Sequence, residues 1–140
     1  MRAVRPNSVT TATTVSRQAS FISVSIAAMA PVWRDTAVVA ITEFGRTAHV
    51  NGTDGTDHGT ATVALLAGGA LKGGRVIADW PGLKPARLHE GRDLKPTTDL
   101  RAVLKGLLQD HLRVEPTVLA TKVFPDSAAV KPMSGLLQQA

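Results

Sequence analysis

The chain has 140 residues, of which 44% are hydrophobic and 19% charged, so it is long enough to bury the core of one domain. It contains no cysteine, which excludes disulfides and thiolate metal sites. The formal net charge of +5 comes mainly from four arginines and no acid in residues 1–34, and because nucleic-acid binding needs clustered Lys and Arg, we expect no nucleic-acid partner.

Residues 1–30 differ in composition from the rest of the chain. Positions 1–19 are polar and lack helical periodicity, which predicts disorder or a non-native start, and residues 20–31 predict a short helix. No apolar run approaches the roughly 18–20 residues that span a bilayer, and no export signal is recognisable, so we expect no membrane span. We therefore divide the chain into an N-terminal segment, 1–30, and a domain, 31–140.

Three apolar segments predict β-strands. Residues 36–42 form a continuous β-branched run, which is typical of a strand buried on both faces of a parallel sheet. Residues 62–67 form a second run before a Gly-rich turn, and residues 74–80 predict a third strand at an edge. Strands interleaved with a helix predict an α/β layered fold with flanking helices, although three strands are only part of a usual sheet.

The clearest helix opens at Thr97, Thr98 and Asp99. Either threonine can cap it, and the aspartate suits the positive end of the helix dipole. Its apolar residues recur at helical spacing until about Arg113: Leu100, Val103, Leu104, Leu107 and Leu108. Residues 116–122 predict a short helix or turn, residues 81–96 predict irregular chain because they hold three prolines, and the tail after Pro125 predicts loose order.

Reactive side chains gather in a Gly-rich loop, residues 43–59, after the first predicted strand. Because ligands bind at the carboxyl ends of strands in open α/β sheets, Glu43, Asp57 and His58 predict oxygen and nitrogen ligands for zinc, manganese or a similar divalent ion. Arg46 can bind an anionic oxygen or, equally well, form a salt bridge. The alternative for the whole loop is a solvated polar turn. No other cofactor is indicated.

Five sequence blocks follow one another within residues 31–135. They are Ile41-Thr42-Glu43-Phe44-Gly45-Arg46-Thr47, Gly55-Thr56-Asp57-His58-Gly59, Gly73-Gly74-Arg75-Val76, Asp79-Trp80-Pro81-Gly82-Leu83 and Gly91-Arg92-Asp93-Leu94. Together these blocks resemble a large bacterial family of unknown function that is grouped with the sulfatases and alkaline phosphatases. Its members are usually exported through the twin-arginine route.

This resemblance implies a partial alkaline phosphatase-like fold and assigns metal ligands. Members of the superfamily commonly have a strand that ends in Ser-Asp-His-Gly, whose Asp and His bind metal. Here the corresponding residues run from Thr42 to Gly45, so Glu43 keeps the acid and Phe44 replaces the histidine. His58 then matches the last metal histidine, with Asp57 beside it; in a second register, Asp57 and His58 would themselves be the Asp-His pair.

No segment of residues 1–35 matches the nucleophile region of that superfamily, so no catalytic residue is assigned. We therefore expect the C-terminal fragment of a metal-dependent phosphate- or sulfate-ester hydrolase-like protein, inactive alone. The alternative is a non-catalytic binding or structural module of the same family. Part of a sheet leaves unpaired edges and an uncovered apolar face, so we also expect self-association.

Overall fold

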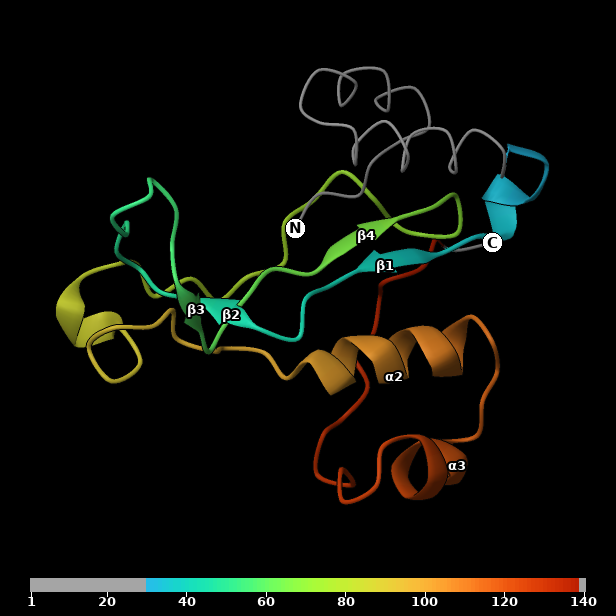
Figure 1. Ribbon diagram of the computed structural model, residues 1–140. Coiled ribbons are helices and arrows are strands. Elements are labelled where there is room, and N and C mark those ends of the chain that lie inside the picture. The colour runs from blue at the N-terminus through green and yellow to red at the C-terminus, as the bar shows by residue number, and fades with distance from the viewer. Residues whose placement is uncertain (1–29, 139–140) are drawn as a thin grey trace.

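The computed structural model describes residues 30–138 (Figure 1). In this part of the chain, β1 (Val38–Ala40) pairs antiparallel with β4 (Leu65–Ala67), and β2 (Gly45–Arg46) pairs antiparallel with β3 (His58–Gly59). The longest element is the helix α2 (Leu100–Asp110); the shorter ones are η2 (Ala30–Asp35), η3 (Pro85–Arg87), α3 (Pro116–Val118) and the π-helical turn η4 (Leu119–Val123). The predictions made for residues 1–29 lie outside the described residues, and the division at residue 30 stays a prediction.

The four strands belong to one long, bent hairpin. The inner pair β2–β3 is nested within the outer pair β1–β4, and the hydroxyl oxygens of Thr42 and Thr62 meet at 3.1 Å between the two pairs. Figure 1 shows the inner pair continuing the line of the outer pair. The expected parallel pairing is therefore wrong for these strands, because parallel neighbours need a long crossover connection, usually a helix, and no helix lies between β1 and β4.

The β1–β4 ribbon buries only one of its faces. Val39 lies opposite Leu66, which is 5% exposed, and both pack into the core. Ala40 and Leu65 lie opposite each other one position along, where side chains point to the other face, and both are exposed. The prediction that residues 36–42 are buried on both faces is therefore wrong: the side chains of this ribbon alternate between core and solvent.

Residues 74–80 form no strand, so the third predicted strand is absent. Val76 and Trp80 are 70% and 64% exposed. The segment starts at Gly74, whose φ of +76° departs from the extended geometry that strand pairing needs. The Arg75 side chain then donates hydrogen bonds to the carbonyl oxygens of Lys72 and Gly135. The beginning of this segment is therefore held by a side chain rather than by the backbone hydrogen bonds of a strand.

The amphipathic helix predicted after Thr98 is confirmed, with shifted ends. The Asp99 carboxylate accepts a hydrogen bond from the backbone N–H of Arg101 at 2.8 Å, so the cap is the aspartate rather than either threonine. The helix ends at Asp110, short of Arg113. Its apolar face packs beneath the ribbon in a core of buried residues: Leu66, Leu71, Val103, Leu107 and Leu136.

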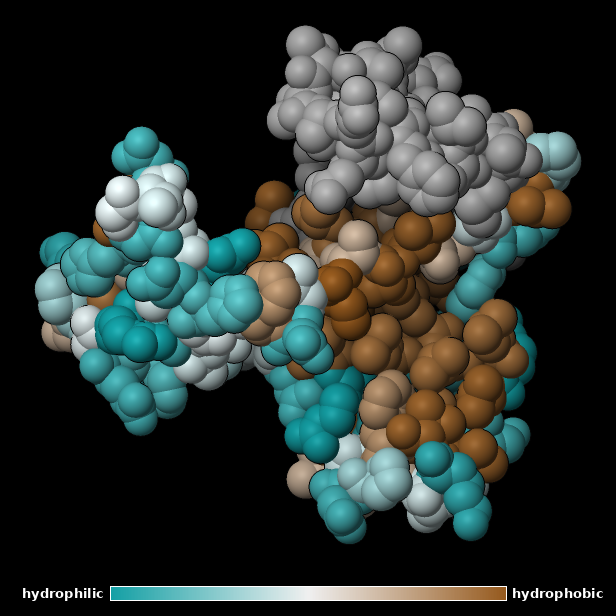
Figure 2. Space-filling view, viewed as in Figure 1, coloured by the Kyte–Doolittle hydropathy of each residue, from teal (hydrophilic) through white to brown (hydrophobic). Residues whose placement is uncertain are grey.

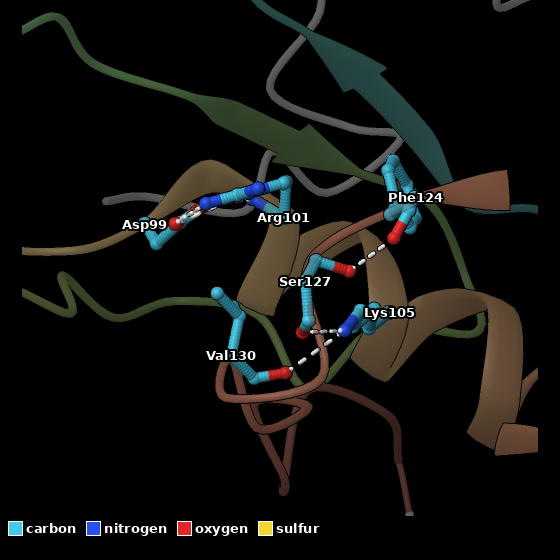
Figure 3. A network of polar contacts seen from close by, with 6 residues as sticks. All are labelled: Asp99, Arg101, Lys105, Phe124, Ser127 and Val130. Carbon is cyan, nitrogen blue, oxygen red and sulfur yellow. Dashed lines mark hydrogen bonds and ion pairs between the residues drawn. The ribbon is translucent and has the colours of Figure 1, made fainter. Parts of the chain in front are cut away.

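The last described residues cross α2 as a C-terminal strap, residues 124–138. The ammonium of Lys105, a residue that is 3% exposed, donates to the carbonyl oxygens of Ser127 at 2.5 Å and Val130 at 3.0 Å (Figure 3). The backbone N–H of Met133 donates to the carbonyl oxygen of Ala102 at 2.8 Å. Loose order after Pro125 is therefore a wrong prediction, whereas α3 and η4 confirm the short helix expected over residues 116–122.

The same strap also holds the turn that follows β4. The backbone N–H of Lys72 donates to the carbonyl oxygen of Leu136 at 2.8 Å, and that of Gln138 donates to Ala70 at 2.9 Å. Leu136 is 5% exposed and belongs to the core. The strap thus joins the ribbon to α2 through backbone hydrogen bonds and one buried leucine.

Large apolar side chains are more often exposed than buried in residues 30–138. Eight hydrophobic residues are buried, whereas twelve large ones are exposed. Figure 2 shows a broad apolar surface over the ribbon and the neighbouring helices.

The described residues form a mixed arrangement of short antiparallel strands and helices that is consistent with an α/β class, and no alkaline phosphatase-like layering is seen in them. None of their helices is long and apolar enough to cross a membrane.

Candidate functional site

The inner hairpin pair brings two of the sequence blocks together. Gly45 lies opposite Gly59, and Arg46 lies opposite His58. A Cβ atom added at Gly59 would lie 2.6 Å from the carbonyl carbon and oxygen of Arg46, closer than real Cβ contacts allow. The glycines therefore permit the close approach that places the first block, which ends at Thr47, beside the block that ends at Gly59.

His58 stacks on the ring of Phe44. The two ring centroids are 4.2 Å apart and the planes differ by 11°. The guanidinium carbon of Arg46 lies 5.3 Å from the centroid of the Phe44 ring, within the range of a cation–π contact. Because His58 is exposed and its imidazole makes no hydrogen bond to another described residue, its ring nitrogens are accessible while one ring face is covered.

The tip of the hairpin is organised by one asparagine. The Asn51 side-chain oxygen accepts hydrogen bonds from the backbone N–H groups of Thr53 and Gly55, each at 3.0 Å, and its amide donates to the Asp57 carboxylate at 2.9 Å. Asp54 adopts a φ of +59°, a conformation that Asp and Asn tolerate better than most residues. The loop is therefore a hydrogen-bonded turn, in which Asp57 is held by Asn51.

A buried carboxylate supports the hairpin from a distant segment. Asp93 is 8% exposed and accepts hydrogen bonds from the Thr60 hydroxyl and the Arg92 guanidinium, each at 2.7 Å. Arg92 also donates to the carbonyl oxygen of His58 at 3.2 Å. The hydrogen bond from Arg92, and then that from Thr60, hold the pKa of the Asp93 carboxyl below its ordinary value. Asp93 therefore stabilises the hairpin in its ionised form.

We expect the substitution Asp93→Asn to flatten the acid dependence of stability. The pKa of Asp93 is lower in the folded chain than in the unfolded chain, where it has its ordinary value of 3.8. The ionised carboxylate therefore stabilises the fold at pH values above 3.8, and this stabilisation is lost as the pH falls through the lower pKa of the folded chain. The melting temperature should be measured by circular dichroism near neutral pH and below the ordinary pKa. The Asp93→Asn variant should melt at a lower temperature than the native protein near neutral pH. Its melting temperature should then fall by less than that of the native protein when the pH is lowered.

The matched control is Asp54→Asn. Asp54 is exposed at the hairpin tip, and asparagine suits its positive φ. This variant should retain the native acid dependence. An Asp93→Asn variant with the same loss of melting temperature in acid as the native protein would contradict the assigned role.

The structure places the predicted site residues along the hairpin. Glu43 is exposed just before β2, Asp57 is exposed and bonded to Asn51, and His58 opens β3 opposite Arg46. Within residues 30–138, no three His, Asp or Glu side chains gather closely enough to hold a metal ion. That Glu43 and His58 share one ion stays a prediction.

Two supporting residues were missed by the sequence reasoning. In the sequence, Asp93 is one member of the block Gly91-Arg92-Asp93-Leu94, and Asn51 is one of several polar residues in the loop 43–59. An Arg-Asp pair carries no signal of burial by itself, because most such pairs are exposed. Asn51 had a usable signal, since Asn followed by Gly is a common turn dipeptide. The segment that carries Asp93 is itself folded back, because His89 forms an antiparallel backbone bridge with Asp93.

Comparison with known proteins identifies the family of this chain. A family model described as a protein of unknown function (DUF1501) matches residues 21–123, about three quarters of the chain. The matched region contains the whole ribbon, the inner hairpin, Asp93 and α2, and it ends where the C-terminal strap begins. No match was found among curated proteins or solved structures.

Proposed function

The chain belongs to the DUF1501 family of proteins of unknown function, and from its inner hairpin we propose that it contributes a metal- and anion-binding segment to a hydrolase-like protein acting on phosphate or sulfate esters. The observation that carries this proposal is the pairing of Arg46 with His58. It puts a cation beside an accessible imidazole, although the two residues come from separate sequence blocks. In this proposal the chain binds but does not hydrolyse an ester alone.

His58 is the proposed metal ligand. Neutral imidazole is a common ligand of zinc, and the His58 ring nitrogens are accessible. Glu43, which precedes β2, and Asp57, which precedes β3, would add carboxylate oxygens as further metal ligands. A bound divalent ion would stabilise negative charge on a phosphate or sulfate group.

Arg46 is the proposed anion-binding residue. One of its guanidinium nitrogens donates to the Thr56 carbonyl oxygen at 2.7 Å, which fixes the side chain. The guanidinium has five N–H donors, so others remain for an anionic oxygen. Arg46 is exposed and its contact with the Phe44 ring keeps it on the hairpin.

The second candidate function is a non-catalytic binding or structural module. The stack of Phe44 on His58 favours it, because phenylalanine stands where the resemblance places a metal histidine. In this alternative, Phe44, His58 and Arg46 stabilise the hairpin and bind no metal. Metal titration separates the two candidates.

We expect zinc to bind to the intact chain and to lose affinity in the variant His58→Ala. The loss should exceed about tenfold, since even substitutions outside the ligand set cost metal sites about 10–100-fold in affinity. Isothermal titration calorimetry with zinc chloride measures this. His111→Ala is the matched control, because His111 follows α2, away from the hairpin, and should leave affinity unchanged. Absence of zinc binding by the intact chain would support the second candidate.

The same chain should not turn over aryl phosphates or aryl sulfates in the presence of zinc or manganese. The physical reason is that one metal-binding segment supplies no activated nucleophile, which ester hydrolysis requires. A colorimetric assay with both ester classes tests this expectation. Metal-dependent turnover that disappears in His58→Ala would overturn it.

A further inference from the structure

The hairpin tip contains an asparagine followed by a glycine, Asn51 and Gly52. In this dipeptide the backbone nitrogen of the glycine can approach the side-chain carbonyl carbon of the asparagine, because no side chain on the glycine obstructs it. Apart from its two chain neighbours, no atom lies within 4 Å of a Cβ added at Gly52. The Gly52 N–H makes no hydrogen bond to another described residue, so its nitrogen is free to react.

Three hydrogen-bond donors surround the side-chain oxygen of Asn51. It accepts from the backbone N–H groups of Thr53 and Gly55, each at 3.0 Å, and from the Thr53 hydroxyl at 2.9 Å. Attack on the side-chain carbonyl carbon would move negative charge onto this oxygen, and donors already in place stabilise such charge, as they do in an oxyanion hole. The folded tip therefore favours addition to the Asn51 side chain.

The amide nitrogen of Asn51 holds the neighbouring carboxylate. It donates to an oxygen of Asp57 at 2.9 Å, and this is the one hydrogen bond that the Asp57 carboxylate makes to another described side chain. If the amide became an acid, this donor would be lost. Two ionised carboxylates would then face each other at about the spacing of the former hydrogen bond, where like charges repel.

We propose that Asn51 is a self-modification site, at which intramolecular deamidation converts its amide to an acid and releases Asp57. The reacting groups all belong to the hairpin tip, and the three donors on the Asn51 oxygen carry the inference. The reaction needs water but no metal, anion or second protein, so it is independent of the function proposed above.

The reaction balances without an oxidant or a reductant. The Gly52 nitrogen forms a bond to the side-chain carbonyl carbon of Asn51, and the bond from that carbon to the amide nitrogen breaks. The proton lost from the Gly52 nitrogen leaves with the amide nitrogen as ammonia, and a succinimide ring remains. Water then opens the ring at either carbonyl carbon, which gives aspartate in one case and isoaspartate in the other.

The first test follows the folded chain during incubation at neutral pH. Peptide mass spectrometry should detect conversion of Asn51 to aspartate and isoaspartate. Thr53→Val removes one donor and should slow the conversion by about 2- to 10-fold, the factor that one ordinary hydrogen bond contributes to an equilibrium. Thr56→Val is the matched control, because the hydroxyl that donates to Asn51 is that of Thr53. An Asn51 that stays intact, or equal rates in both variants, would overturn the proposal.

The second test measures the release of Asp57. Asn51→Asp has the aspartate product from the start, and hydrogen exchange at the Thr47 N–H, which donates to the Asp57 carbonyl oxygen at 3.1 Å, should become at least about tenfold faster. The double variant Asn51→Asp, Asp57→Asn exchanges donor and acceptor, restores the hydrogen bond and should return exchange to near the native rate. Native-like exchange in Asn51→Asp, or no recovery in the double variant, contradicts the proposed release.

Discussion

A chain that ends at Val123 should lose its cooperative thermal transition. This truncation removes the C-terminal strap and with it Leu136 from the core, together with the backbone bonds that join the strap to Ala102 and Ala70. Loss of one buried leucine side chain alone costs about 2–5 kcal/mol, whereas whole domains are stable by only about 5–15 kcal/mol. Circular dichroism during heating measures the effect, which we expect to be a broad, non-cooperative melt.

The control for this truncation is a chain that ends at Gln138. It keeps every strap contact, including the bond from the Gln138 backbone N–H to Ala70. This chain should melt like the full-length protein. If the chain ending at Val123 also melts cooperatively at a similar temperature, then the strap does not hold the fold together.

The substitution Gly106→Ala should destabilise the protein although it improves the helix. Within an isolated helix, alanine is better than glycine by about 1 kcal/mol. Here, however, an added Cβ would overlap the Met133 carbonyl oxygen, a backbone atom of the strap that crosses α2 at this point. Overpacking of this kind typically costs about 1–3 kcal/mol, and because the clash is with backbone we expect the upper part of this range. Urea denaturation measures the change in the free energy of unfolding.

Gly52→Ala is the matched control for that experiment. No atom lies within 4 Å of a Cβ added at Gly52. The same chemical change should therefore alter stability little, and an effect at Gly106 can be assigned to the strap. A Gly106→Ala protein that is more stable than the native protein would mean that the strap moves away at little cost.

Several local features could be predicted because their causes are local. The helix α2 follows from apolar residues at helical spacing after an acidic residue, and its apolar face needs no information from elsewhere in the chain, although the helix ends at Asp110, before the predicted Arg113. The same holds for the short helix that begins at Pro116, since proline favours the first helical turn. In the candidate site, the reactive loop after the first predicted strand indicated Glu43, Arg46, Asp57 and His58, and the strand register places two of them, Arg46 and His58, opposite each other.

The chain's own sequence thus determined which segments are apolar, where the main helix begins and which loop carries the reactive side chains. Only the tertiary structure decided how those segments meet. An apolar run such as residues 36–42 has the same composition in a parallel or an antiparallel sheet, and its pairing depended on which partner the chain could reach without a crossover. Likewise, burial of Lys105 depends on its hydrogen bonds to the strap, and burial of Asp93 depends on its hydrogen bond from Thr60. These partners lie far away in the sequence. Hydrogen bonds that satisfy a buried charge are formed between segments, so they leave no periodic pattern in either segment.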